Sequence, residues 1–409
     1  MKHIYKTIFA AAIMLASGVA AIHADDFQED RYRRSSLCSI LVKHQEQKFA
    51  DSIANQFIQI RIPETYNDHN LSVQVVSVNS KGNYDAAINR FIKDNNIASR
   101  LVGKWFDRDV YTGACTMNLV KKRGVLDASV HDYQVAAAET RGFAEIQDAG
   151  EELIPNTYLL MNEVNYVDKA KRSSFWGGLA ALAGGLAAAY TGNSSYQTLG
   201  NTVGAVVSSI KGFSVKIHSR LYKLVWDEET AGMFYNQHYT DEASLDAAKK
   251  SAFERDRSKY RLEYVGDIVS KGSRTSFLGI KEEEPHKMIR KATARAIDEN
   301  IADLGKKYEQ FRVKIPISTV DPTITAPIGL REGMTPQSKY EVLEKQQDDK
   351  GRVKYKRVGV VKPVASKIWD NRFMAKEEGA FGANFGCTTF VRVSGKKPEP
   401  GYLLREIVK

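Results

Sequence analysis

The stretch from Phe175 to Gly212 most constrains the fold, because small residues recur in it at every fourth position. They form two arms, separated by a turn-like break at residues 191–195. Two helices with small residues at this spacing can bring their backbones close together, since no side chain holds them apart. Each glycine costs a helix about 1 kcal/mol relative to alanine, so their number indicates a packing role. We predict a helical hairpin with a glycine-zipper seam of Gly177, Ala181, Gly185, Ala189, Gly200, Gly204, Ser208 and Gly212.

The flanks of this predicted hairpin leave two interpretations open. Trp176 and Tyr190 bracket the first arm as membrane-interface anchors do, so we add Trp176 to the predicted interaction residues. However, the first arm is shorter than the roughly 20 residues that a spanning helix needs, and the second arm contains polar residues. The hairpin is therefore expected either to dock on the protein body or another subunit, or to insert into a membrane.

The first 24 residues have the features of a secretory signal peptide. Lys2 and Lys6 precede an apolar run from Ile8 to Val19, and a small-residue exit ends at Ala24. We expect a mature chain that starts near Asp25 and is exported to the periplasm or the outer membrane.

The charge balance is basic, with 59 Lys and Arg residues against 49 Asp and Glu residues. A basic surface favours anionic partners, of which an anionic membrane surface suits an exported protein best. No nucleic-acid-binding motif accompanies the charge, so nucleic acid is not favoured. Protein partners or self-association are expected through the hairpin.

The region of residues 25–126 is predicted to be a mixed α/β domain, because strand and helix patterns alternate in it. The expected elements are a strand over Ser35–Val42, a helix over Lys43–Ile58, a strand over Leu71–Val78 and a helix over Tyr84–Ile97.

Residues 127–317 are predicted to form a central region of antiparallel strands and helices around the hairpin. A helix is expected from Asp127 or Ser129 to Leu153, followed by a strand over Thr157–Val167. Alternation over Phe213–Tyr222 predicts a strand with one wet face. Arg261–Val269 and Ser273–Ile280 are expected to pair as a hairpin. A long helix should begin at Glu282–Pro285, where acidic residues and proline suit its first turn, and run to about Gln310.

Residues 318–409 are predicted to form a small all-β barrel. The expected strands are Lys339–Glu344, Val353–Val361, Cys387–Val393 and Tyr402–Ile407. The predicted fold class of the whole chain is α+β.

Two resemblances bear on the setting of the chain. The turn Ile328–Gly333, the strand Lys339–Val342 and the return strand Arg357–Val361 are similar to the small C-terminal β-barrels of periplasmic envelope-assembly proteins such as flagellar assembly protein T. Three further segments look like an uncharacterised family of exported proteins from Bacteroidota-type bacteria: Asp148–Leu153, Arg220–Trp226 and Lys367–Phe373. This second resemblance implies a periplasmic or outer-membrane setting, and it carries no known activity or catalytic residues.

Candidate catalytic and metal-binding residues are few. Cys38 and His44 flank a predicted strand end and would need to meet in space to act as a nucleophile and base; a core cysteine and a solvated histidine are the alternative. Asp148, Glu151 and Glu152 share a predicted helix face, which suits either a hard cation or a wet surface. Phosphate-binding glycine motifs are absent, so no cofactor is predicted.

The three cysteines, Cys38, Cys115 and Cys387, are an odd set with wide spacing. Buried free thiols are expected, with one disulfide as the alternative.

The sequence as a whole favours a non-catalytic binding or assembly component of the cell envelope. Two alternatives stay open: a pore-forming or translocation subunit, in which Phe213–Tyr222 would become a barrel strand, and a secreted hydrolase whose site is built from distant residues.

Overall fold

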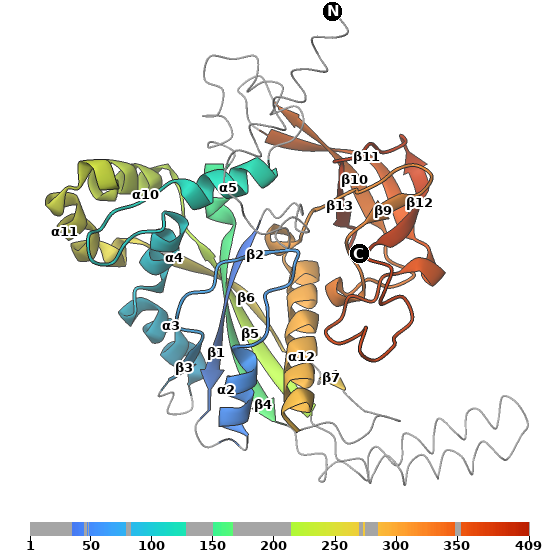
Figure 1. Ribbon diagram of the computed structural model, residues 1–409, viewed down its shortest axis with the longest axis horizontal. Coiled ribbons are helices and arrows are strands. Elements are labelled where there is room, and N and C mark those ends of the chain that lie inside the picture. The colour runs from blue at the N-terminus through green and yellow to red at the C-terminus, as the bar shows by residue number, and fades with distance from the viewer. Residues whose placement is uncertain are drawn as a thin grey trace, which may run out of the picture. The chain divides into compact units, whose positions relative to one another are not determined.

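The computed structural model describes residues 35–44, 47, 49–78, 83–127, 150–166, 214–269, 273–274, 285–347 and 353–408. All of them belong to the same compact unit of the chain. Helices and two β-sheets make up the fold (Figure 1), which confirms the α+β class.

The first sheet has seven strands in the order β2-β1-β4-β5-β6, with β3 also paired to β1 and β7 to β5. β1 runs parallel to β2, β3 and β4, whereas β4, β5 and β6 are antiparallel neighbours. The strands are β1 (Ser36–Lys43), β2 (Asn67–Asp68), β3 (Val75–Ser77), β4 (Thr157–Tyr166), β5 (Ser214–Leu224), β6 (Leu262–Val269) and β7 (Ser273–Arg274). Strands from both sides of the predicted boundary at residues 126 and 127 therefore share one sheet.

Helices cover both faces of this sheet (Figure 1). α2 (Ala50–Phe57) and α12 (Pro285–Lys307) pack on one face, in a core that includes Leu37, Leu160 and Leu221. α3 (Tyr84–Asp94) and α4 (Ile97–Trp105) pack on the other face, against side chains such as Ile40 and Leu159. The alternation of strand side chains between two faces places these two cores back to back.

A third core holds the remaining helices of this region. It is rich in aromatic residues, including Trp105, Phe106 and Phe234. The helices are α5 (Asn118–Asp127), α10 (Glu228–Met233) and α11 (Ala247–Arg255). α11 lies within the polar stretch between β5 and β6.

The second sheet is a nearly closed barrel of six antiparallel strands in the order β8-β13-β10-β11-β12-β9, which confirms the predicted C-terminal β structure. The strands are β8 (Ile315–Pro316), β9 (Ile324–Ala326), β10 (Tyr340–Gln347), β11 (Val353–Pro363), β12 (Thr388–Gly395) and β13 (Leu403–Glu406). A bridge between Thr319 and Thr325 draws the two ends of this order together. The last four strands of the chain agree with those predicted from the sequence, whereas β9, which is only three residues long, was not predicted.

Several predicted elements differ from the structure. The helix predicted over Tyr84–Ile97 is broken between α3 and α4, because Asn96 adopts a left-handed conformation that an α-helix cannot contain. The helix predicted from Lys43 begins only at Ala50, since β1 continues to Lys43 and Phe49 has a φ of 66°.

The predicted wet face of β5 holds only at the start of the strand, where Lys216 is exposed, because Arg220 and Tyr222 on the same face are buried. β4 and β6 flank this strand, and helices cover both of its faces: Ile217 and Leu221 pack toward α12, while Tyr222 packs with the α3 and α4 side chains. The predicted pairing of residues 261–269 with 273–280 is also wrong as far as the described residues extend. β6 and β7 both pair with β5, one after the other along the same edge.

Gly266 of β6 leaves no room for a side chain. A Cβ there would lie 1.9 Å from the hydroxyl of Tyr308, and the φ of 155° is itself unfavourable for other residues. We expect Gly266→Ala to lower the free energy of unfolding by about 2–3 kcal/mol, measured by urea denaturation. In a Tyr308→Ala background the same substitution should cost clearly less, and an equal cost would contradict the steric explanation.

No helix among the residues described here combines the length and the apolar character that crossing a bilayer would require.

Candidate functional site

All nine predicted interaction residues lie outside the described residues. They are Trp176, Gly177, Ala181, Gly185, Ala189, Gly200, Gly204, Ser208 and Gly212. Asp148 of the predicted acidic trio, the predicted signal peptide and most of the helix predicted up to Leu153 lie outside them as well. The structure does describe β4 and β5, the strands that immediately precede and follow residues 167–213.

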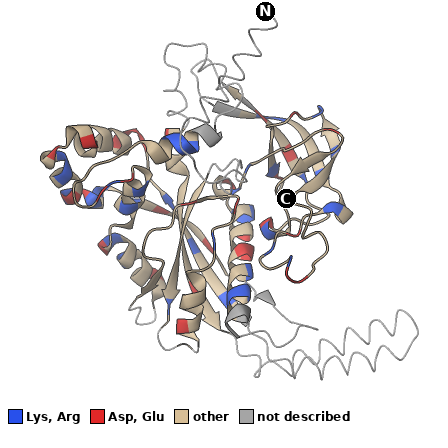
Figure 2. Cartoon of the chain, viewed as in Figure 1, with Lys and Arg blue, Asp and Glu red and all other residues tan. Residues whose placement is uncertain are grey.

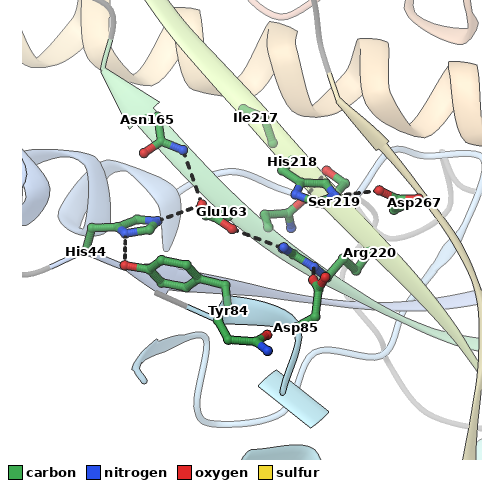
Figure 3. Close-up of polar contacts among 12 residues, drawn as sticks. His44, Tyr84, Asp85, Glu163, Asn165, Ile217, His218, Ser219, Arg220 and Asp267 are labelled. Atoms are coloured by element: carbon green, nitrogen blue, oxygen red, sulfur yellow. Dashed lines mark hydrogen bonds and ion pairs between the residues drawn. The ribbon is translucent and has the colours of Figure 1, made fainter. Parts of the chain in front are cut away.

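β4 and β5 pair with each other along their whole shared length. The register runs from Tyr158 opposite Lys223 to Tyr166 opposite Val215. The described residues on either side of 167–213 therefore lie next to each other, on adjacent paired strands. Polar side chains at this end of the strand pair, drawn in Figure 3, form the candidate functional site.

Glu163 of β4 lies at the centre of this site, on the face toward α3 (Figure 3). Its Oε2 accepts a hydrogen bond of 3.1 Å from Nη1 of Arg220 on β5. Nε of Arg220 also contacts Asp85 Oδ1 of α3 at 2.5 Å. The Arg220 side chain is only 5% exposed, so it joins the two strands and the helix in a largely water-excluded position.

His44, which follows β1, extends the site on the other side of Glu163. Its Nδ1 lies 2.5 Å from the hydroxyl of Tyr84, and its Nε2 lies 3.2 Å from Glu163 Oε1. The solvated His44 that the sequence favours is wrong, because the side chain is only 13% exposed and is enclosed by these partners. Glu163, Arg220 and His44 come from three strands or their ends, so their contacts connect β1, β4 and β5.

Cys38 and His44 do not form a nucleophile–base pair. Six residues along an extended chain separate them by about 20 Å. Burial raises the pKa of the Cys38 thiol to about 11, so the thiol is protonated near neutral pH and is a poor nucleophile. Cys38 and Cys115 are buried free thiols, as expected, whereas Cys387 is only partly buried.

A second ion pair lies beside this group, on β5 and β6. Nε2 of His218 is 2.6 Å from Oδ2 of Asp267. Burial favours the neutral carboxyl, but the hydrogen bond and charge of His218 outweigh it and lower the pKa of Asp267. His218 lies directly opposite Glu163 in the strand register, so the two ion pairs form one polar band across β4, β5 and β6.

The opposite face of the same strands carries a buried row of neutral polar side chains. Asn162 Nδ2 donates to Ser39 Oγ at 2.9 Å, and Ser219 Oγ donates to Asn162 Oδ1 at 2.7 Å. Asn300 of α12 then donates to Ser219 Oγ at 3.0 Å. β1, β4, β5 and α12 are thus connected by hydrogen bonds as well as by apolar packing. Polar contacts thus fix β4 and β5 from both faces of the sheet.

Neither the contacts around Glu163 nor the buried row that contains Asn162 and Ser219 was predicted from the sequence. Asn162 and Ser219 interrupt runs of apolar residues on the faces that point toward α12, and this was the available signal. Polar residues at buried strand positions need hydrogen-bond partners, and their partners are distant in the chain.

The described residues contain no group of three His, Cys, Asp or Glu side chains arranged to hold a metal ion. Two small cavities lie in this part of the chain, with volumes of about 40 and 10 Å³. The larger cavity lies between α12 and the C-terminal barrel, away from Glu163 and Arg220. A single water needs roughly 10–15 Å³ by this measure, so these cavities suit a few waters.

No protein-family model matches the sequence, and a search of curated proteins finds no match.

Proposed function

We propose that this protein is an exported, non-catalytic binding or assembly component of the cell envelope, which associates through the glycine-zipper segment of residues 175–212. The main support is the pairing of the strands on either side of this segment. With Tyr166 opposite Val215, a segment that runs out and back, as two helical arms would, starts and ends at one place.

The polar contacts at this place favour a mechanical role over a chemical one. Arg220 and the enclosed His44 both engage Glu163, so its carboxylate is committed to holding strands together. Ser39, Asn162 and Ser219 are buried and bonded to one another, so they are poor candidates for attacking a substrate. Strands held together in this way would transmit a force or a displacement from the segment to the whole sheet.

The cellular location of the protein is proposed from its sequence. The signal-like residues 1–24, the resemblance to exported proteins and the basic charge balance agree on a periplasmic or outer-membrane setting. Detection of the processed chain, beginning near Asp25, in the envelope fraction of the native host would support this part of the proposal.

The association is tested with leucine substitutions in the predicted seam. We expect Gly185→Leu and Gly204→Leu to abolish self-association or vesicle binding of the mature chain, because leucine would hold the two arms apart. Light scattering after size-exclusion chromatography and co-flotation with anionic vesicles are the measurements. Gly232→Leu is the matched control, since the position of its Cβ has no neighbour within 4 Å.

Unchanged association in both seam variants would contradict the proposal. So would a mature parent chain that stays monomeric and binds neither vesicles nor envelope fractions. Dye release from the same vesicles would instead favour the pore-forming alternative.

A further inference from the structure

One side of α12 carries charged residues that contact the C-terminal region instead of water. Figure 2 shows both signs of charge along this helix. Arg295 donates to Glu378 at 2.6 Å and to the carbonyl of Phe373, and Lys306 donates to the carbonyl of Gly333 at 3.0 Å. The apolar side of α12 packs on the first sheet. The helix therefore lies in a joint between the first sheet and the barrel.

The 40 Å³ cavity lies in this joint and contains three carboxyl groups. Asp298 comes from α12, Glu332 precedes β10, and Glu406 ends β13. Tyr340 Oη and both Asp298 carboxylate oxygens are buried without a hydrogen bond of good geometry. Three acids from three elements therefore line one small, largely enclosed space, where negative charge is costly.

The hydrogen bonds of two of these acids are compatible with a protonated carboxyl group. The backbone N–H of Gly329 and Nδ2 of Asn371 both donate to Glu332 Oε2, each at 2.8 Å. A proton on Oε1 of Glu332 would therefore cost neither bond. Ser338 donates to Oε1 of Glu406 at 3.0 Å, which in the same way leaves Oε2 able to carry a proton.

Cations face these acids from several elements. Arg331 lies 2.9 Å from Asp298, and Arg295 and Lys306 face the cavity region from α12. Arg312 adds a charge near Glu406, while Glu64 adds a negative charge near Arg331.

Burial nevertheless dominates at the three acids. It raises the pKa of Asp298, Glu332 and Glu406, and the neighbouring cations and hydrogen bonds offset this rise only in part. Tyr66 and Tyr340, which also line the cavity, have pKa values well above 10 because of burial and stay neutral.

We propose that the joint between α12 and the C-terminal barrel is a pH-responsive contact, which tightens when Glu332 and Glu406 are protonated and loosens as they ionise. An acid that holds its proton more tightly in the folded chain stabilises the fold at low pH. That contribution is lost as the pH rises through the folded pKa. Buried His69 and His238 act in the opposite direction, because burial lowers their pKa values and acid must charge them on unfolding. Both histidines are present in the variants and in the parent, so the difference in stability between a variant and the parent reports on the substituted acid.

The test compares Glu332→Gln and Glu406→Gln with the parent mature chain. Glutamine mimics the neutral acid and can accept the same hydrogen bonds. We expect each variant to raise the urea midpoint relative to the parent at about pH 7.5, and to raise it less at about pH 5.5. Hydrogen exchange in residues 285–307 and 328–347, corrected for intrinsic rates, should slow in the variants at the higher pH.

Glu344→Gln is the matched control. A hydrogen bond from Tyr402 lowers the pKa of Glu344, so the difference between this variant and the parent should not change between the two pH values. A pH-independent effect in both cavity variants, or lower stability of both at the higher pH, would overturn the proposal. Using two variants keeps the test decisive if one of them does not fold.

Discussion

Replacing Arg220 with leucine is expected to lower the free energy of unfolding by about 3–5 kcal/mol. The guanidinium is almost fully buried and bridges Glu163 of β4 and Asp85 of α3. Without it, the largely buried Glu163 carboxylate would lose its cationic partner while remaining enclosed beside His44. The cost of an uncompensated buried charge, more than the strength of the ion pair itself, sets the size of this effect.

Urea denaturation followed by circular dichroism would measure this loss. Adding Glu163→Gln to Arg220→Leu should restore part of the stability, because the charge left behind is removed. The Asp85 side chain is 71% exposed, so Asp85→Asn should cost less than about 1 kcal/mol and serves as the control. If Arg220→Leu cost no more than this control, the site would not hold the strands as described.

Replacing Arg123 with leucine should cost about 3 kcal/mol, for a different reason. Arg123 of α5 is 6% exposed and donates to neutral acceptors: Ser36 Oγ at 3.0 Å, His69 Nδ1 at 3.1 Å and the carbonyl of Asp68 at 3.0 Å. Its guanidinium also lies 4.3 Å from the ring centre of Trp105. Leucine would leave several buried acceptors without a donor and would remove the cation–π contact.

The ring of His69 reports on this substitution directly. Burial and the charge of Arg123 hold the pKa of His69 well below its usual value, so the neutral ring accepts at Nδ1 and donates from Nε2 to the carbonyl of Leu101. Thermal or urea unfolding gives the loss of stability, and a histidine NMR titration should show the His69 pKa rising in the variant. Exposed Arg90 of α3 is the control, and Arg90→Leu should change stability by less than about 0.5 kcal/mol. A similar small change for Arg123→Leu would contradict the prediction.

The sequence predicts the elements whose pattern is local. Alternation finds β4 and β5, and the acidic residues that precede Pro285 in the sequence mark the start of α12. Short strands such as β2 and β9 carry no pattern of their own, because partner strands define them. The burial of Arg220 and Tyr222 on the second face of β5 could not be predicted either, since α3 and α4 reach this face from elsewhere in the chain.

The candidate site depends even more on distant residues. Glu163 and Arg220 are 57 positions apart, and Arg220 and Asp85 are 135 apart. A lone charged residue in an amphipathic strand is ordinarily exposed to water, so the residues around Glu163 and Arg220 in the sequence favour exposed side chains instead of a buried ion pair. Tertiary packing brings these partners together, and no local pattern in a single sequence shows which distant residues become neighbours.

The adjacency of Tyr166 and Val215 has a consequence for how this protein can change over evolutionary time. Tyr166 and Val215 are paired on neighbouring strands. Residues 167–213 can therefore change in length and composition without changing any backbone pairing between β4 and β5. Lengthening this segment adds only a slowly growing closure entropy. The pairing of β4 with β5 therefore sets no fixed length for residues 167–213, and related chains can differ there while sharing the same sheet.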